Sequence, residues 1–196
     1  MLKSEVVGGL RRLFTALSVV LLASGVVGAA HSAALVGVTF PDQATVSGKP
    51  VVLNGLGVRS ATMLKVKVYV IGLYLESKSG DPQAIIDSNG NKRIAMHFVH
   101  DVSAEKLRGG WTEGFEENAK DVAGVKKEIA KFNASMRDVK SGDTIVLDVF
   151  DDNVDVLIND SRVDSIAGKD FQRALLSIWL GPKPPNEELK EGILGH

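Results

Sequence analysis

The sequence contains no cysteine among its 196 residues. Thiol catalysis, iron–sulfur clusters and cysteine-ligated zinc sites are therefore excluded, and hydrophobic packing rather than disulfides must hold the fold together. An excess of basic residues is also lacking, since the formal net charge is −1. We therefore expect no nucleic-acid partner, because binding to a phosphate backbone depends on clustered positive charge.

Histidine is scarce, with four in the chain, two of which are His31 and the C-terminal His196. His97 and His100 are separated by an odd number of positions in a predicted strand, so their side chains point to opposite faces. We predict no metal site on this basis. Four acidic residues surround a predicted hairpin, and we interpret them as solvated turn residues, with weak calcium binding as the alternative. They are Asp151, Asp152, Asp155 and Asp160.

Sequence motifs for cofactors are missing as well. The chain has neither a Gly-x-Ser-x-Gly nucleophile elbow nor a phosphate-binding loop. Gly55 and Gly57 resemble half of a dinucleotide-binding motif, but they lead into a strand instead of a helix. We predict that the protein binds no cofactor.

The first 34 residues have the pattern of a secretory signal peptide. Basic residues precede an apolar run over 13–22, and small residues follow as far as Ala34. We expect cleavage after Ser32 or Ala34, export to the periplasm, and one mature domain over 35–196. An uncleaved anchor is the alternative, although the run is marginal for the roughly 20 apolar residues of a span. No later stretch is apolar enough, so the mature form is not expected to span a membrane.

The order of the predicted elements is strands, helices, a hairpin and further helices, which is typical of an α+β fold with a mainly antiparallel sheet. The clearest strand covers 65–75, where apolar residues first alternate and then occupy both faces. A glycine-rich turn is predicted at 54–59, before this strand. The other predicted strands are 36–40, 45–46, 51–53, 93–100, 144–149 and 154–158, and the predicted helices are 81–90, 103–122, 126–136, 171–180 and a short one after 186.

Two features of these elements bear on ligand binding. Leu107, Trp111 and Phe115 recur every four residues along the predicted helix 103–122, so they share one apolar face. Arg59 follows the two glycines and precedes small residues, so its guanidinium can reach a cavity and pair with a carboxylate. An ordinary surface arginine is the alternative.

Several segments resemble the chalcone isomerase superfamily. The run Gly55-Leu56-Gly57-Val58-Arg59 and the strand from Lys67 to Glu76 resemble its paired motifs. Phe40-Pro41 and the segment 171–181 extend the likeness over the mature chain. The likeness implies an open-faced β-sandwich with a large antiparallel sheet, a layer of helices and a ligand cleft between them. We identify the chain with a bacterial exported branch of this superfamily.

The resemblance also indicates what the chain lacks as an enzyme. Catalytic members use an arginine, two hydroxyl residues, a tyrosine and an asparagine to close a flavanone ring. Arg59 matches the arginine, but Tyr69 occupies a threonine position. The helical tyrosine and asparagine positions fall on Leu107 and Gly114, and the last polar position falls near Ile178. Most of the groups that orient the substrate are therefore replaced.

The resemblance to the fatty-acid-binding branch implies another function. There an arginine and a tyrosine hold a carboxylate, and Arg59 and Tyr69 match them. A plain surface tyrosine is the alternative for Tyr69. The two residues can share a ligand only if the chain reverses near 61–64, because ten residues of extended strand span about 33 Å. The expected acyl-channel residues are Leu107, Trp111, Phe115 and Ile178.

Three hypotheses follow. The first is a non-catalytic protein that binds a small amphipathic carboxylate such as a fatty acid. The second is an intramolecular lyase or isomerase acting on a chalcone-like phenolic substrate. The third is an interaction module of the cell envelope with a collapsed cleft. The sequence identifies no protein partner.

Overall fold

One antiparallel sheet dominates the computed structural model of the chain, which describes residues 32–61 and 64–196. Residues 1–31 of the signal peptide predicted over 1–34 lie outside the described residues. Seven strands within them form this sheet, and each pairs with its neighbour in sequence. They are β3 (Gln43–Val46), β4 (Lys49–Ala61), β5 (Val66–Leu75), β6 (Lys92–Phe98), β7 (Thr144–Phe150), β8 (Asn153–Ile158) and β9 (Ser161–Ala167). The predicted α+β class is confirmed.

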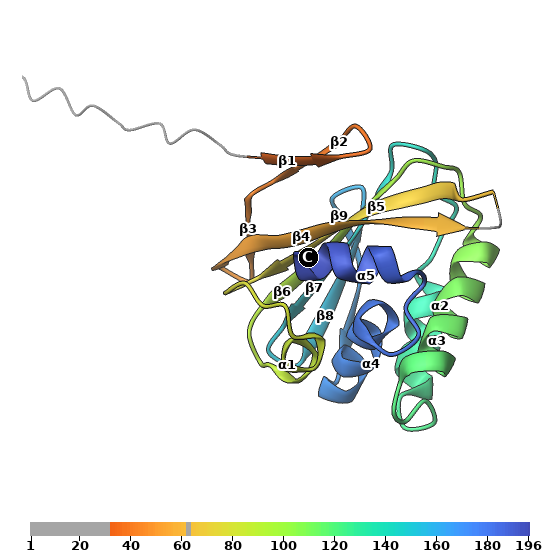
Figure 1. Cartoon of the computed structure of the whole chain (residues 1–196). Coiled ribbons are helices and arrows are strands. Elements are labelled where there is room, and N and C mark those ends of the chain that lie inside the picture. Colours follow the sequence, from red (N-terminus) through yellow and green to blue (C-terminus); the bar gives the residue numbers. More distant parts are fainter. Residues whose placement is uncertain (1–31, 62–63) are drawn as a thin grey trace, which may run out of the picture.

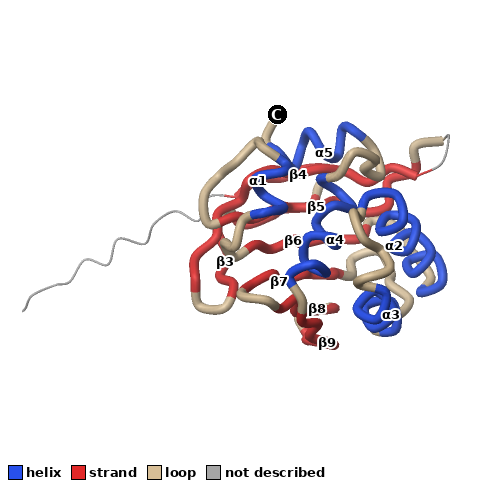
Figure 2. Tube along the Cα trace, turned by 90° about the horizontal axis from the view of Figure 1, so that it is seen from below, coloured by secondary structure: helices blue, strands red, loops and turns tan. Residues whose placement is uncertain are grey.

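The helices of the described residues cover one face of the sheet (Figures 1 and 2). They are α1 (Pro82–Asp87), α2 (Ala104–Asn118), α3 (Lys126–Ala134), α4 (Lys169–Leu180) and α5 (Glu187–Leu194). The main core lies between this layer and the sheet, where Phe115, Phe132 and Phe171 pack as an aromatic cluster. No helix in 32–61 or 64–196 is long and apolar enough to cross a bilayer.

The opposite face of the sheet is partly covered by a separate hairpin, β1 (Ser32–Leu35) and β2 (Val38–Pro41). Phe40 of this hairpin packs with Val70 and Tyr74 in a second, smaller core. Residues 38–40 of the strand predicted over 36–40 lie in β2, as predicted. The predicted start was wrong, because Val36 and Gly37 both adopt positive φ and form the hairpin turn.

Side-chain caps explain where two helices begin. Before α1, a carboxylate oxygen of Asp81 accepts hydrogen bonds from two backbone N–H groups of the first turn, and Pro82 occupies the first helical position. Before α2, the Ser103 hydroxyl accepts a hydrogen bond from a first-turn N–H at 3.3 Å. This helix ends at Asn118, so the prediction that it extends to Val122 was wrong by about one turn.

The prediction of a glycine-rich turn at 54–59 is also wrong, because these residues lie inside the long strand β4. The two glycines allow α5 to pack directly on this strand. A Cβ at Gly55 would overlap the Gly192 carbonyl oxygen, and a Cβ at Gly57 would lie 2.5 Å from the Leu189 carbonyl oxygen. The motif therefore serves close packing of a helix on a strand.

Candidate functional site

A cavity of about 550 Å³ lies on the helical side of the sheet. Its walls come from the paired ends of β4 and β5, from α2, and from the connection between α4 and α5. The apolar part of the lining includes Val66, Val68, Phe98, Leu107, Trp111 and Ile178. A volume in this range accommodates a small organic ligand.

Arg59 of β4 is half-buried and lines this cavity, which favours the interpretation as a cavity-facing arginine over that as a plain surface arginine. Its Nη1 donates hydrogen bonds to the carbonyl oxygens of Ser60 and, at 3.2 Å, Pro185. These bonds hold the guanidinium against the α4–α5 connection. Within 32–61 and 64–196, Nε and Nη2 of Arg59 have no hydrogen-bond partner, so they remain free for an anion.

Tyr69 of β5 lies directly opposite Arg59 in the β4–β5 ladder, and it too lines the cavity. The chain reverses between Ala61 and Val66, which meets the condition for the two side chains to share one ligand. A bulge at Val68 interrupts the ladder beside this pair, as is common next to binding sites.

The Tyr69 side chain is only 5% exposed, which excludes a surface tyrosine. Its hydroxyl oxygen accepts a hydrogen bond from Trp179 Nε1 at 3.1 Å, so the hydroxyl proton remains available for another acceptor. Burial raises the pKa of Tyr69, and the bond from Trp179 and the charge of Arg59 offset only part of this rise. Tyr69 is therefore a neutral hydrogen-bond donor beside a guanidinium.

Three of the expected acyl-channel residues lie in the cavity wall. Leu107 and Trp111 come from α2, and Ile178 comes from α4. The two helices meet closely there, since a Cβ at Gly114 would lie 2.8 Å from Ile178 Cγ2. Phe115 is not brought to the cavity: it is fully buried in the aromatic cluster of the core. A four-residue spacing defines a helix face, but it does not show where a cavity ends along that face.

The α4–α5 connection is a wall that the sequence did not predict. The side chain of Asn118 donates to the Lys183 carbonyl at 2.9 Å and accepts from the Lys183 N–H at 2.8 Å. Asn186 donates to the Val58 carbonyl at 3.1 Å. These bonds fix Pro184 and Pro185 against the cavity. The pair of prolines marks a rigid connection in the sequence, but not its place beside Arg59.

The rim of the cavity carries charges of both signs. Lys183 pairs with Glu117 at 3.4 Å, and Lys140 pairs with the rim residue Asp101 at 3.0 Å. Two of the rim carboxylates are thus already neutralised by lysines. Arg59 has no carboxylate partner within the described ranges.

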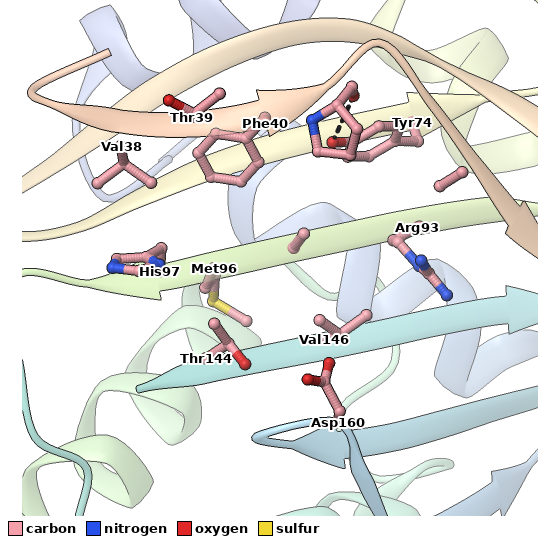
Figure 3. A pocket seen from close by; sticks show the side chains of 13 residues that line it. Val38, Thr39, Phe40, Tyr74, Arg93, Met96, His97, Thr144, Val146 and Asp160 are labelled. Carbon is pink, nitrogen blue, oxygen red and sulfur yellow. Dashed lines mark hydrogen bonds between the residues drawn. The ribbon is translucent and has the colours of Figure 1, made fainter. Parts of the chain in front are cut away.

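A smaller cavity of about 190 Å³ lies on the opposite face of the sheet, under β2 (Figure 3). Tyr74 donates to the Pro41 carbonyl there at 3.0 Å, as the dashed line in Figure 3 shows. The arginine of this cavity, Arg93, is already paired with both carboxylate oxygens of Asp148, at 2.6 and 2.7 Å. A ligand carboxylate would have to compete with that pair, so the larger cavity is the stronger candidate.

The histidines and acidic residues form no metal centre in the part of the chain that the structure describes. His100 lines the larger cavity and His97 the smaller one, so they lie on opposite sides of the sheet. Asp151, Asp152 and Asp160 are exposed, as the interpretation as solvated turn residues requires. That interpretation is wrong for Asp155, which lies in β8, pairs with Arg162 at 3.1 Å and has a side chain only 14% exposed.

Comparison with known proteins agrees with this architecture. A family model described as chalcone isomerase-like matches residues 32–195. The fold is similar to the crystal structure of an Arabidopsis thaliana fatty-acid binding protein, with a TM-score of 0.70 and 17% sequence identity over 84% of this chain and 96% of that one. No curated protein sequence matches the chain. At this identity the likeness to the plant protein establishes the fold alone.

Proposed function

Because this chain belongs to the chalcone isomerase-like family, we propose that its larger cavity binds a small amphipathic carboxylate, such as a fatty acid, without catalysing a reaction. The observation that carries the proposal is the cross-strand pair of Arg59 and Tyr69 at an apolar cavity. The similar plant structure is that of a fatty-acid binding protein, which supports the same ligand class.

The chemistry of the pair suits a carboxylate. The free nitrogens of Arg59 supply charge and two-point geometry, and the Tyr69 hydroxyl supplies a further donor. The ligand tail would then lie against Leu107, Trp111 and Ile178, which expose no charged group to it.

The same residues argue against an isomerase. The positions that the superfamily resemblance assigns to catalytic polar groups are Leu107, Gly114 and Ile178, and all three line the cavity with hydrocarbon or backbone. Tyr69 is the remaining acid–base candidate, and its raised pKa makes it a poor base near neutral pH.

Displacement of a fluorescent fatty-acid probe by hexadecanoic acid tests the proposal. We expect wild type and the control Arg173→Ala, which removes a surface arginine of α4, to bind equally. Arg59→Ala should bind about tenfold to a hundredfold more weakly, the usual effect of losing a charge-assisted contact. Methyl hexadecanoate should bind wild type and Arg59→Ala alike. Equal binding of hexadecanoic acid by all three proteins would contradict the proposal.

For localisation, we propose export to the periplasm, within a bacterial exported branch of the family. The support is the signal-like pattern of residues 1–34. Cleavage after Ser32 retains three of the four residues of β1, whereas cleavage after Ala34 retains only Leu35. Amino-terminal sequencing of the mature protein should therefore begin at Ala33. A chain that retains Met1 in the cell would contradict export with cleavage.

A further inference from the structure

The end of the β4–β5 hairpin exposes apolar side chains beside the candidate site. Leu64 is 87% exposed, the largest value among the exposed large hydrophobic residues of the described chain, and Val66 is 37% exposed. Both views place this end of the hairpin at the periphery of the molecule, on the same side as α2 (Figures 1 and 2). An isolated exposed leucine needs no explanation, but this one adjoins a ligand cavity.

The connection to the cavity is direct. Val66 is itself part of the cavity wall, and so is Ala61 at the end of the paired strand. These two residues are close to Leu64 along the chain, so this part of the cavity wall adjoins the exposed leucine.

Lysines alternate with the exposed apolar residues. Lys65 and Lys67 are both exposed, and neither forms a salt bridge with any residue in 32–61 or 64–196. Lys65 is held in the left-handed region, with φ of 50°, which fixes the turn that presents Leu64. The acidic group influenced by Lys65 is Glu188, whose pKa is lowered mainly by hydrogen bonds and only to a smaller extent by this lysine. The hairpin end thus combines apolar surface with unpaired positive charge.

We propose that this hairpin end, formed by Leu64, Lys65, Val66 and Lys67, docks on an anionic lipid bilayer. The inference rests on the proposed function, since an amphipathic carboxylate partitions into bilayers. The leucine and valine enter the interfacial region, and the lysines contact anionic headgroups. Docking places the cavity wall at the bilayer surface, so the ligand passes between bilayer and cavity without entering bulk water.

Sedimentation with lipid vesicles tests the inference. Wild type should bind vesicles of phosphatidylcholine with 30 mol % phosphatidylglycerol (about one anionic lipid in three) more strongly than vesicles of phosphatidylcholine alone. Leu64→Asp and the double variant Lys65→Glu/Lys67→Glu should each reduce binding to the anionic vesicles about tenfold. The matched control is Val163→Asp, a substitution of a valine that is 39% exposed on β9. It should bind the vesicles like wild type.

Hexadecanoic acid binding without vesicles separates the two proposals. Leu64→Asp should retain wild-type affinity in solution, and its transfer of a fluorescent fatty acid to anionic vesicles should slow. Wild type that binds hexadecanoic acid but not anionic vesicles overturns the docking inference and leaves the proposed function intact. Vesicle binding that Leu64→Asp does not weaken also overturns it. Vesicle binding by a protein that takes up no hexadecanoic acid overturns the proposed function instead.

Discussion

Arg59 and Tyr69 face each other across the β4–β5 ladder, and both side chains line the larger cavity. Their spacing along the chain would keep them far apart in one continuous strand. The hairpin converts that separation into a cross-strand pair, the arrangement in which two side chains lie closest on a sheet. The pair therefore provides a cation and a neutral donor at a single point of the cavity wall.

Tyr69→Phe tests the contribution of the phenol hydroxyl. The substitution retains the ring that packs against Phe98 at 5.5 Å and removes the donor to the ligand. Hexadecanoic acid should bind about fivefold to tenfold more weakly, since a neutral hydrogen bond contributes about 1 kcal/mol. Displacement titration at pH 7 measures this loss.

Tyr74→Phe is the matched control, because Tyr74 is the other tyrosine of the chain and bonds to Pro41 on the opposite face of the sheet. It should lower thermal stability slightly and leave the affinity for hexadecanoic acid unchanged. Equal losses of affinity in both variants would mean that the substitutions act through a general change of the fold and not through a lost contact with the ligand.

The fold was predictable where local patterns and tertiary structure agree. Alternation followed by continuous apolar residues over 65–75 indicated β5, and the Asp81-Pro82 pair indicated the start of α1. β9 was not predicted, because Ser161–Ala167 is an edge strand with mostly polar side chains and shows no apolar alternation. Ser161–Ala167 forms a strand because it hydrogen-bonds to its neighbour β8, and the local sequence does not indicate this pairing.

The site residues were predictable where the family resemblance assigned a residue type to a position. They were less predictable where the tertiary packing decides whether a side chain lines the cavity or is buried in the core. Arg59 and Tyr69 are brought together as the resemblance implied. Phe115 shares a helix with Trp111, yet it packs into the aromatic cluster instead of the cavity. The wall formed by Pro185 depends on contacts between distant segments, which no local pattern encodes.

The packing of α5 on β4 gives a stability prediction. In Gly57→Ala the new methyl group would lie 2.5 Å from the Leu189 carbonyl oxygen, and backbone on both sides resists movement. We expect a loss of about 2 kcal/mol in the free energy of unfolding, typical of overpacking. Urea denaturation followed by circular dichroism measures it.

Gly109→Ala is the control for that substitution. Gly109 lies in α2, and a Cβ there meets no atom within 4 Å. The change should stabilise the protein by about 0.5–1 kcal/mol, because alanine favours the helix over glycine. If Gly57→Ala were as stable as Gly109→Ala, close approach would not explain the two glycines of β4.

The burial of Lys92 leads to a prediction of how the stability of the fold depends on pH. Its side chain is 2% exposed, and Nζ donates to the carbonyl oxygens of Ser88 and Gly90, each at 2.8 Å. Burial lowers the pKa of Lys92 to about 8, below its usual value of 10.5. Between these two values the unfolded chain holds a proton that the folded chain has lost, so stability rises with pH.

We expect the free energy of unfolding to increase by about 2 kcal/mol between pH 7 and pH 10 on account of Lys92. Above pH 10 the trend should reverse, because burial raises the pKa of Tyr74 to about 12 and the unfolded chain then releases the tyrosine proton first. Urea denaturation across this range measures the slope, and Lys92→Met should abolish the rise while leaving the fall above pH 10. A rise of the same size in Lys92→Met would mean that another group titrates in this window.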